Sequence, residues 1–115
     1  MLRVLTILLS LIMALPVLAL EVVATTSSMG MLAREVGGPG VTVTVLVPPD
    51  RDPHTLQARP SMMKALRGAD LLVAVGAELE VGWLPPALSG AANPALLPGR
   101  RGHFEAAAWI TLLDA

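Results

Sequence analysis

Three apolar, β-branched segments with an amphipathic segment between each pair limit how this chain can fold. They span residues 20–26, 41–47 and 71–75. Val and Thr dominate the second segment, and the third is a short continuous apolar run, which is typical of a strand buried on both faces. Strands that alternate with helices through short connections form parallel sheets with helices on both faces. The predicted fold class is therefore α/β.

The segment between the first two strands has helical spacing. Met29, Leu32 and Val36 recur at intervals of three and four residues, which places them on one face of a helix. Ser27 and Ser28 precede them, and we expect these hydroxyls to cap the helix.

A second helix is predicted to begin after Pro60, with Ser61 as its N-cap. Its apolar residues also follow helical spacing: Met62, Ala65, Leu66 and Ala69. Beyond the third strand the pattern weakens. We expect a short helix over residues 83–88, a loop over 91–102 and a further helix over 105–113.

The first 19 residues have the layout of a cleaved secretory signal peptide. Arg3 precedes 17 uncharged residues, of which 14 are apolar, and small residues at positions 17 and 19 suit a cleavage site. An uncleaved membrane anchor is the alternative. We interpret residues 20–115 as one truncated α/β lobe, because three strands make only half of a usual α/β domain. An exported chain without cysteine fits the periplasm.

Composition excludes several classes of protein. With 54% hydrophobic residues, a net charge of −1 and no cysteine, the chain is neither a disordered segment nor a disulfide scaffold. Eight basic against nine acidic residues make a nucleic-acid partner unexpected. The sequence lacks the motifs G-x-x-x-x-G-K-[ST], G-x-S-x-G and H-E-x-x-H, so we expect no enzyme.

The loop that follows the second strand carries the candidate chemistry. Three prolines stiffen residues 48–55, which also hold His54 and Asp52. Ligands bind open parallel sheets at the carboxyl ends of the strands, and imidazole is the commonest metal ligand. Asp52 is a candidate to orient the second ring nitrogen of His54, although a backbone carbonyl would also serve. One histidine is not a complete site, so a rigid surface loop without function remains the alternative.

Residues 52–84, DPHTLQARPSMMKALRGADLLVAVGAELEVGWL, closely resemble the periplasmic metal-binding proteins of ABC importers, the ZnuA/TroA type. The resemblance rests on linked motifs in a fixed order: Asp52-Pro53-His54, Pro60-Ser61, Ala69-Asp70-Leu71, residues 79–84 (LEVGWL) and the opening residues 22–38. It spans essentially the whole predicted mature chain.

This resemblance implies two α/β lobes that are joined by a long helix and hold the metal between them. It implies that His54 is the first metal ligand. It also implies that the further His, Glu or Asp ligands come from positions that this chain does not contain. The chain would then be the N-terminal part of such a receptor.

The function implied is capture of a divalent transition metal, with Zn²⁺ favoured and Mn²⁺ possible, for import. The partner would be an ABC transporter permease in the inner membrane, and we expect a monomer. A metal-linked surface adhesin involved in cell adhesion and a non-functional truncated remnant are the alternatives.

Three other side chains are weaker candidates. His103 matches no ligand motif of the family, and we expect it to be a solvated loop histidine. Glu78 and Glu80 follow the third strand. For Glu80, a structural role, capping the helix that follows, is favoured over metal ligation.

Overall fold

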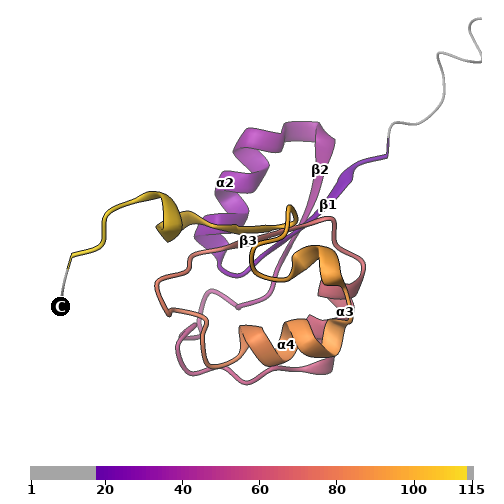
Figure 1. The fold of residues 1–115 in the computed structure, drawn as a ribbon. Helices are drawn as coiled ribbons and strands as arrows, with labels where there is room; N and C mark the ends of the chain where they lie inside the picture. Colours follow the sequence, from indigo (N-terminus) through magenta and orange to yellow (C-terminus); the bar gives the residue numbers. More distant parts are fainter. Residues whose placement is uncertain (1–17, 114–115) are drawn as a thin grey trace, which may run out of the picture.

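The computed structural model describes residues 18–113, which contain one parallel four-stranded sheet in the order β2-β1-β3-β4 (Figure 1). Its strands are β1 (Leu20–Ala24), β2 (Val41–Val45), β3 (Leu71–Ala74) and β4 (His103–Glu105). Residues 1–17 of the predicted signal peptide lie outside the described residues. Within residues 18–113, no helix has the length and apolar character that a membrane span requires.

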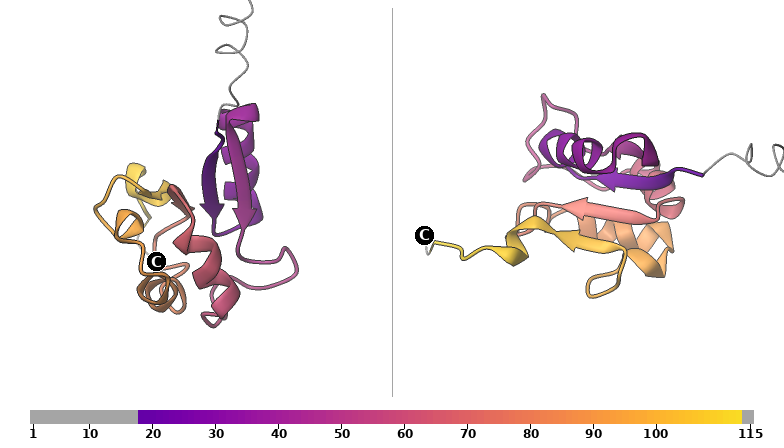
Figure 2. Two further views of the ribbon diagram at one scale, coloured as in Figure 1. Left: turned by 90° about the vertical axis from the view of Figure 1, so that its right-hand side faces the viewer. Right: turned by 90° about the horizontal axis from the view of Figure 1, so that it is seen from above.

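Helices cover both faces of this sheet, which confirms the predicted α/β class. They are α2 (Ser27–Gly37), α3 (Pro60–Arg67) and α4 (Leu84–Ala91), with short 3₁₀ turns at Gly38–Gly40, Pro94–Leu96 and Ala106–Trp109. Helix α2 packs on one face against β1 and β2, whereas α3 and α4 pack together on the other face (Figure 2).

Strand β1 lies between two parallel neighbours, and this pairing fixes the register of the sheet. Val22 lies opposite Val43 of β2 and Leu71 of β3. Because all four strands run in the same direction, their carboxyl ends meet at one edge. The loop after β2, which carries His54, and the loop after β3 both leave the sheet at that edge.

Helices α2 and α3 do not have the serine N-caps that we predicted; their N-caps are Thr26 and Arg59. Thr26 caps α2, because its extended backbone continues from β1 and its hydroxyl accepts a hydrogen bond from the Met29 N–H at 3.3 Å. Pro60 occupies the first turn of α3, so the helix begins before Ser61 and Arg59 is the N-cap without a side-chain bond.

The prediction of a helix over residues 105–113 was wrong, whereas residues 92–102 form the predicted loop, apart from the short 3₁₀ turn at Pro94–Leu96. Residues 103–105 instead form β4, which the three-strand prediction lacked, and a short 3₁₀ turn follows. The edge of β3 explains this, because its backbone groups pair with the incoming chain. The Leu72 N–H donates to Gly102 O at 2.7 Å, and the Ala107 N–H donates to Val75 O at 2.9 Å. Sheet pairing outweighs the helical propensity of the alanines in this segment.

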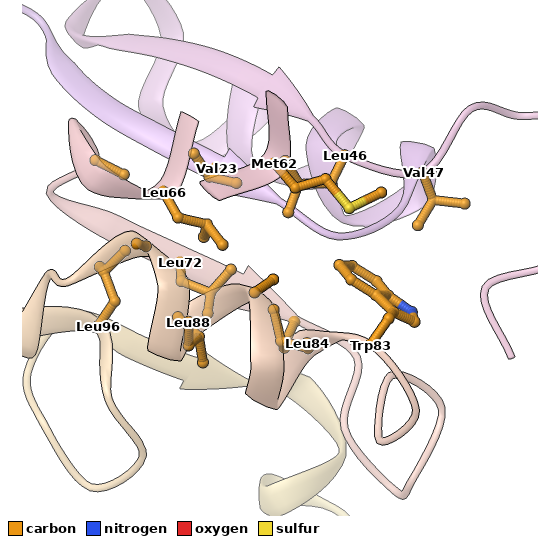
Figure 3. Packing of buried hydrophobic residues seen from close by; sticks show 14 residues of the cluster. Val23, Leu46, Val47, Met62, Leu66, Leu72, Trp83, Leu84, Leu88 and Leu96 are labelled. Carbon is orange, nitrogen blue, oxygen red and sulfur yellow. The ribbon is translucent and has the colours of Figure 1, made fainter. Parts of the chain in front are cut away.

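The hydrophobic core lies between the sheet and the layer of α3 and α4 (Figure 3). Leu66 of α3, Leu72 of β3 and Trp83 at the start of α4 are all fully buried. The amphipathic spacing of α3 accounts for this, because Met62 and Leu66 lie one turn apart and both face the core.

Replacement of Leu66 by Ala should lower the free energy of unfolding by about 2–5 kcal/mol, because it leaves a cavity in a packed interior. Leu32→Ala is the matched control, since Leu32 is half exposed on α2. The control should change the free energy by no more than about 0.5 kcal/mol. Urea unfolding of both variants measures the difference, and equal effects would contradict the location of the core.

Candidate functional site

The Asp-Pro-His motif forms a tight turn in the long loop between β2 and α3. The Thr55 N–H donates to the Asp52 carbonyl at 3.2 Å, which closes a turn over residues 52–55 with Pro53 at its second position. Proline favours that position because its ring sets the backbone angle that the turn needs. The turn lies beyond the carboxyl ends of the strands, where the sequence placed the candidate chemistry.

Within this turn, the Asp52 carboxylate holds both the backbone and the ring of His54. One oxygen, Oδ1, accepts a hydrogen bond from the His54 backbone N–H at 2.9 Å and lies 2.9 Å from the ring nitrogen Nδ1. The orienting role proposed for Asp52 therefore has the contact that it needs.

These contacts determine which ring nitrogen is available to a ligand. A carboxylate only accepts hydrogen bonds, so the neutral imidazole carries its proton on Nδ1. Nε2 then has a free lone pair, and no hydrogen bond to it occurs within residues 18–113. The side chains of His54 and Asp52 are 66% and 56% exposed, so a ligand can reach them from solvent.

The hydrogen bonds from His54 also shift the titration of Asp52. The backbone N–H of His54, followed by its ring, lowers the pKa of the Asp52 carboxyl below its usual value. A lowered pKa in the folded state favours the ionised form. The lowered pKa therefore keeps the carboxylate charged, and an acceptor of hydrogen bonds, to a lower pH than for an ordinary aspartate.

Trp83 connects the turn to the core. Its indole Nε1–H donates to the Pro53 carbonyl at 2.8 Å, and the Trp83 side chain is fully buried. The adjacent backbone also approaches the turn, since a methyl group built on Gly82 would lie 3.7 Å from the His54 carbonyl oxygen. Sequence reasoning placed Trp83 in a family motif but did not find this contact. A buried indole N–H needs an acceptor, but the sequence does not say which.

Glu80 is structural, as expected, but it bonds to the end of β3 instead of capping the next helix. Its carboxylate accepts hydrogen bonds from the Val75 N–H at 2.8 Å and from the Gly76 N–H at 2.9 Å. Helix α4 begins after Trp83 and has no side-chain cap. Glu80 is almost fully buried, and these bonds compensate for the loss of water around its charge.

His103 is a strand residue with a nearly buried side chain, so the prediction of a solvated loop histidine was wrong. The ring Nδ1 lies 2.8 Å from the Leu96 carbonyl oxygen, and Nε2 lies 2.9 Å from Glu105 Oε1. Formation of β4 buries the ring, whose side chain is only 6% exposed. Both ring nitrogens contact an oxygen of the chain, so a metal would have to displace one of these contacts.

A cavity of about 680 Å³ opens beside α4. Its lining includes Glu78, His103 and Glu105 among apolar side chains of α4 and the following loop, and it does not include His54 or Asp52. The part of the chain that the structure describes brings together no three His, Cys, Asp or Glu side chains able to hold a metal ion. Among the described residues, the His54 ring is accompanied only by the Asp52 carboxylate.

Comparison with known proteins identifies the family that this geometry fits. Residues 22–103 match the family model described as ZnuA, the periplasmic component A of a zinc-uptake complex. The manganese-binding lipoprotein MntA of Bacillus subtilis is 41% identical over 61 residues, which cover 53% of this chain and 20% of MntA. The residues that match the family model include β2, β3 and both loops at the candidate edge.

Solved structures show the same fold. A crystal structure of ZnuA is 32% identical, with a TM-score of 0.60 over 65% of this chain and 29% of ZnuA. The metal-dependent lipoprotein YcdH from Bacillus subtilis is 24% identical, with a TM-score of 0.66 over 83% of this chain and 34% of YcdH. This chain thus spans between a fifth and about a third of the length of these three proteins.

The pKa of Asp52 should respond only in part to His54→Ala. Alanine removes the ring but retains the backbone N–H, which is the larger cause of the lowered pKa. Carbon NMR titration of the Asp52 carboxyl should give a midpoint below about 3.9 in the parent chain. The midpoint should rise part of the way in the variant. A complete return to the ordinary value would show that the ring alone lowers this pKa.

Proposed function

This chain belongs to the family of periplasmic zinc-uptake complex component A proteins, and we propose that it captures a divalent transition metal for import. The family is one of solute-binding receptors, so the prediction that the chain is not an enzyme is confirmed by its membership. The proposed mechanism is binding and delivery, and no bond in a substrate is made or broken.

The observation that carries the proposal is the orientation of His54. Its Nδ1–H donates to the Asp52 carboxylate, so its Nε2 lone pair points away from that bond and is open to solvent. This is the arrangement of metal-bound histidines, whose other ring nitrogen donates to a carboxylate that fixes the tautomer and increases the basicity of the ligand. Further ligands would have to come from outside residues 18–113.

Zinc is the metal that we propose, with manganese as the alternative. A neutral imidazole suits zinc, whereas manganese prefers a shell richer in oxygen. The matching family model is named for zinc uptake, and the similar MntA is named for manganese binding. We therefore expect Zn²⁺ to compete successfully with Mn²⁺ for His54.

We propose that the protein works in the periplasm and delivers the ion to an ABC transporter permease in the inner membrane. The periplasmic name of the family and the signal peptide predicted for residues 1–19 support this location. Neither the surface adhesin nor the truncated remnant gains support from the family model or from the similar proteins.

Zinc should shift the ring NMR signals of His54 and leave those of His103 unchanged. The chain has only these two histidines, and both ring nitrogens of His103 are already engaged. Binding should be weak, because a complete zinc site has four ligands. Titration with ZnCl₂ followed by carbon-proton NMR of the two rings makes the measurement.

Two controls accompany this titration. His54→Ala should remove the zinc response, and MgCl₂ should produce none in the parent chain, because Mg²⁺ prefers oxygen ligands. A zinc response at His103, or an undiminished affinity in His54→Ala measured by calorimetry, would contradict the assignment of His54 as the ligand.

A further inference from the structure

We propose that Trp83 is the positioning residue for His54, acting through the hydrogen bond between its indole N–H and the Pro53 carbonyl. The role is to hold the 52–55 turn in one orientation against the core, so that the His54 lone pair is presented in a fixed direction. This inference rests on the proposed function of His54 as a metal ligand.

The turn is too exposed to hold itself in place. The bonds between Asp52 and His54 orient the ring within the turn, but they lie at an exposed surface and do not connect the turn to the sheet. Hydrogen bonds of this kind compete with water and contribute little net stability. An anchor for the turn as a whole must therefore come from a buried group.

Trp83 has the properties of such an anchor. Its side chain is fully buried, and Figure 3 shows the ring pointing toward Met62 and Val47 of the core cluster. The indole N–H reaches Pro53, which directly precedes His54, at 2.8 Å. Because core packing fixes the ring, the hydrogen bond from its N–H also fixes the position of the loop backbone at Pro53.

The anchor is itself tied to the sheet. The Trp83 backbone N–H donates to the Glu80 carbonyl at 3.2 Å. The Glu80 carboxylate holds the backbone at the end of β3. The motif of residues 79–84 thus connects the end of one strand to the loop that leaves another. Glu80 and Trp83, three residues apart, provide the two ends of this connection.

This connection matters because one ligand must meet others that lie elsewhere. Metal ligands need defined directions, and sites whose supporting residues leave them loose bind poorly. Groups that orient a metal ligand without touching the metal commonly matter for binding, and their mutation lowers the metal affinity about tenfold or more. Trp83 would act less directly than such a group, because it contacts the backbone of the turn and not the His54 ring.

The test is Trp83→Phe in the complete 115-residue chain without metal. Phenylalanine keeps an aromatic ring in the core and removes the N–H donor. We expect nitrogen relaxation to show a drop in the order parameters of the His54 and Thr55 amides from about 0.85 toward 0.6 or less. We also expect the population of the Nδ1–H tautomer of His54 to fall.

Leu84→Ala is the matched control for loss of stability. Leu84 is buried in the same cluster directly beside Trp83, and its side chain donates no hydrogen bond to the turn. This variant should lose stability while His54 keeps its order parameter and tautomer. Unchanged order in Trp83→Phe, or equal loosening in both variants, would overturn the positioning role.

Should Trp83→Phe fail to fold, replacement of both tryptophans by benzothienylalanine provides the second test. This analogue keeps the two-ring shape and lacks the N–H. The other tryptophan, Trp109, is 77% exposed, so its replacement should have little effect. Loosening of His54 supports the proposal, and an unchanged turn overturns it.

Different measurements test the role of Trp83 and the role of His54, so either proposal can be refuted without the other. The order parameters and tautomer are measured without metal, so they decide the role of Trp83 whether or not His54 binds zinc. A zinc titration that leaves His54 unaffected would refute the proposed function alone.

Discussion

The central position of β1 is the constraint on which the rest of the structure depends. With parallel partners on both sides, β1 forces the chain to cross to β2 and then to return past β1 to β3. The return brings α3 to the face opposite α2 and directs the loops after β2 and β3 to the same edge. The Asp-Pro-His turn and the LEVGWL segment become neighbours for this reason, although about 30 residues separate Pro53 from Trp83.

The polar groups at this edge of the sheet form two sets, one buried and one exposed. Glu80 and the Trp83 indole are buried and bond to backbone atoms, so they contribute to the framework. Asp52 and His54 are exposed and bond to each other, which leaves Nε2 accessible. An exposed histidine on a buried support suits the proposed role of His54 as a metal ligand, which needs both access from solvent and a defined geometry.

His103 illustrates why histidine content alone does not identify a metal site. In sequence it lies in a polar stretch, RRGHFE, which is typical of a surface loop. This stretch pairs with the open edge of β3 and forms β4, which places the ring between the Leu96 carbonyl and Glu105. The two histidines of the chain thus differ by environment: Nε2 of His54 has no hydrogen-bond partner among the described residues, whereas both ring nitrogens of His103 contact oxygens.

The sequence by itself determined the α/β class, the first three strands, the three helices and the proline-stiffened loop that carries His54. These features depend on periodicity and on proline, both of which act over a few residues. The fourth strand, the burial of His103, the bonds of Glu80 and the contact between Trp83 and Pro53 were decided only by the tertiary structure. Each of these depends on a donor meeting an acceptor, or on a ring meeting a sheet edge, across many residues. Local pattern shows that a buried indole or carboxylate needs a partner, but only the assembled sheet supplies one.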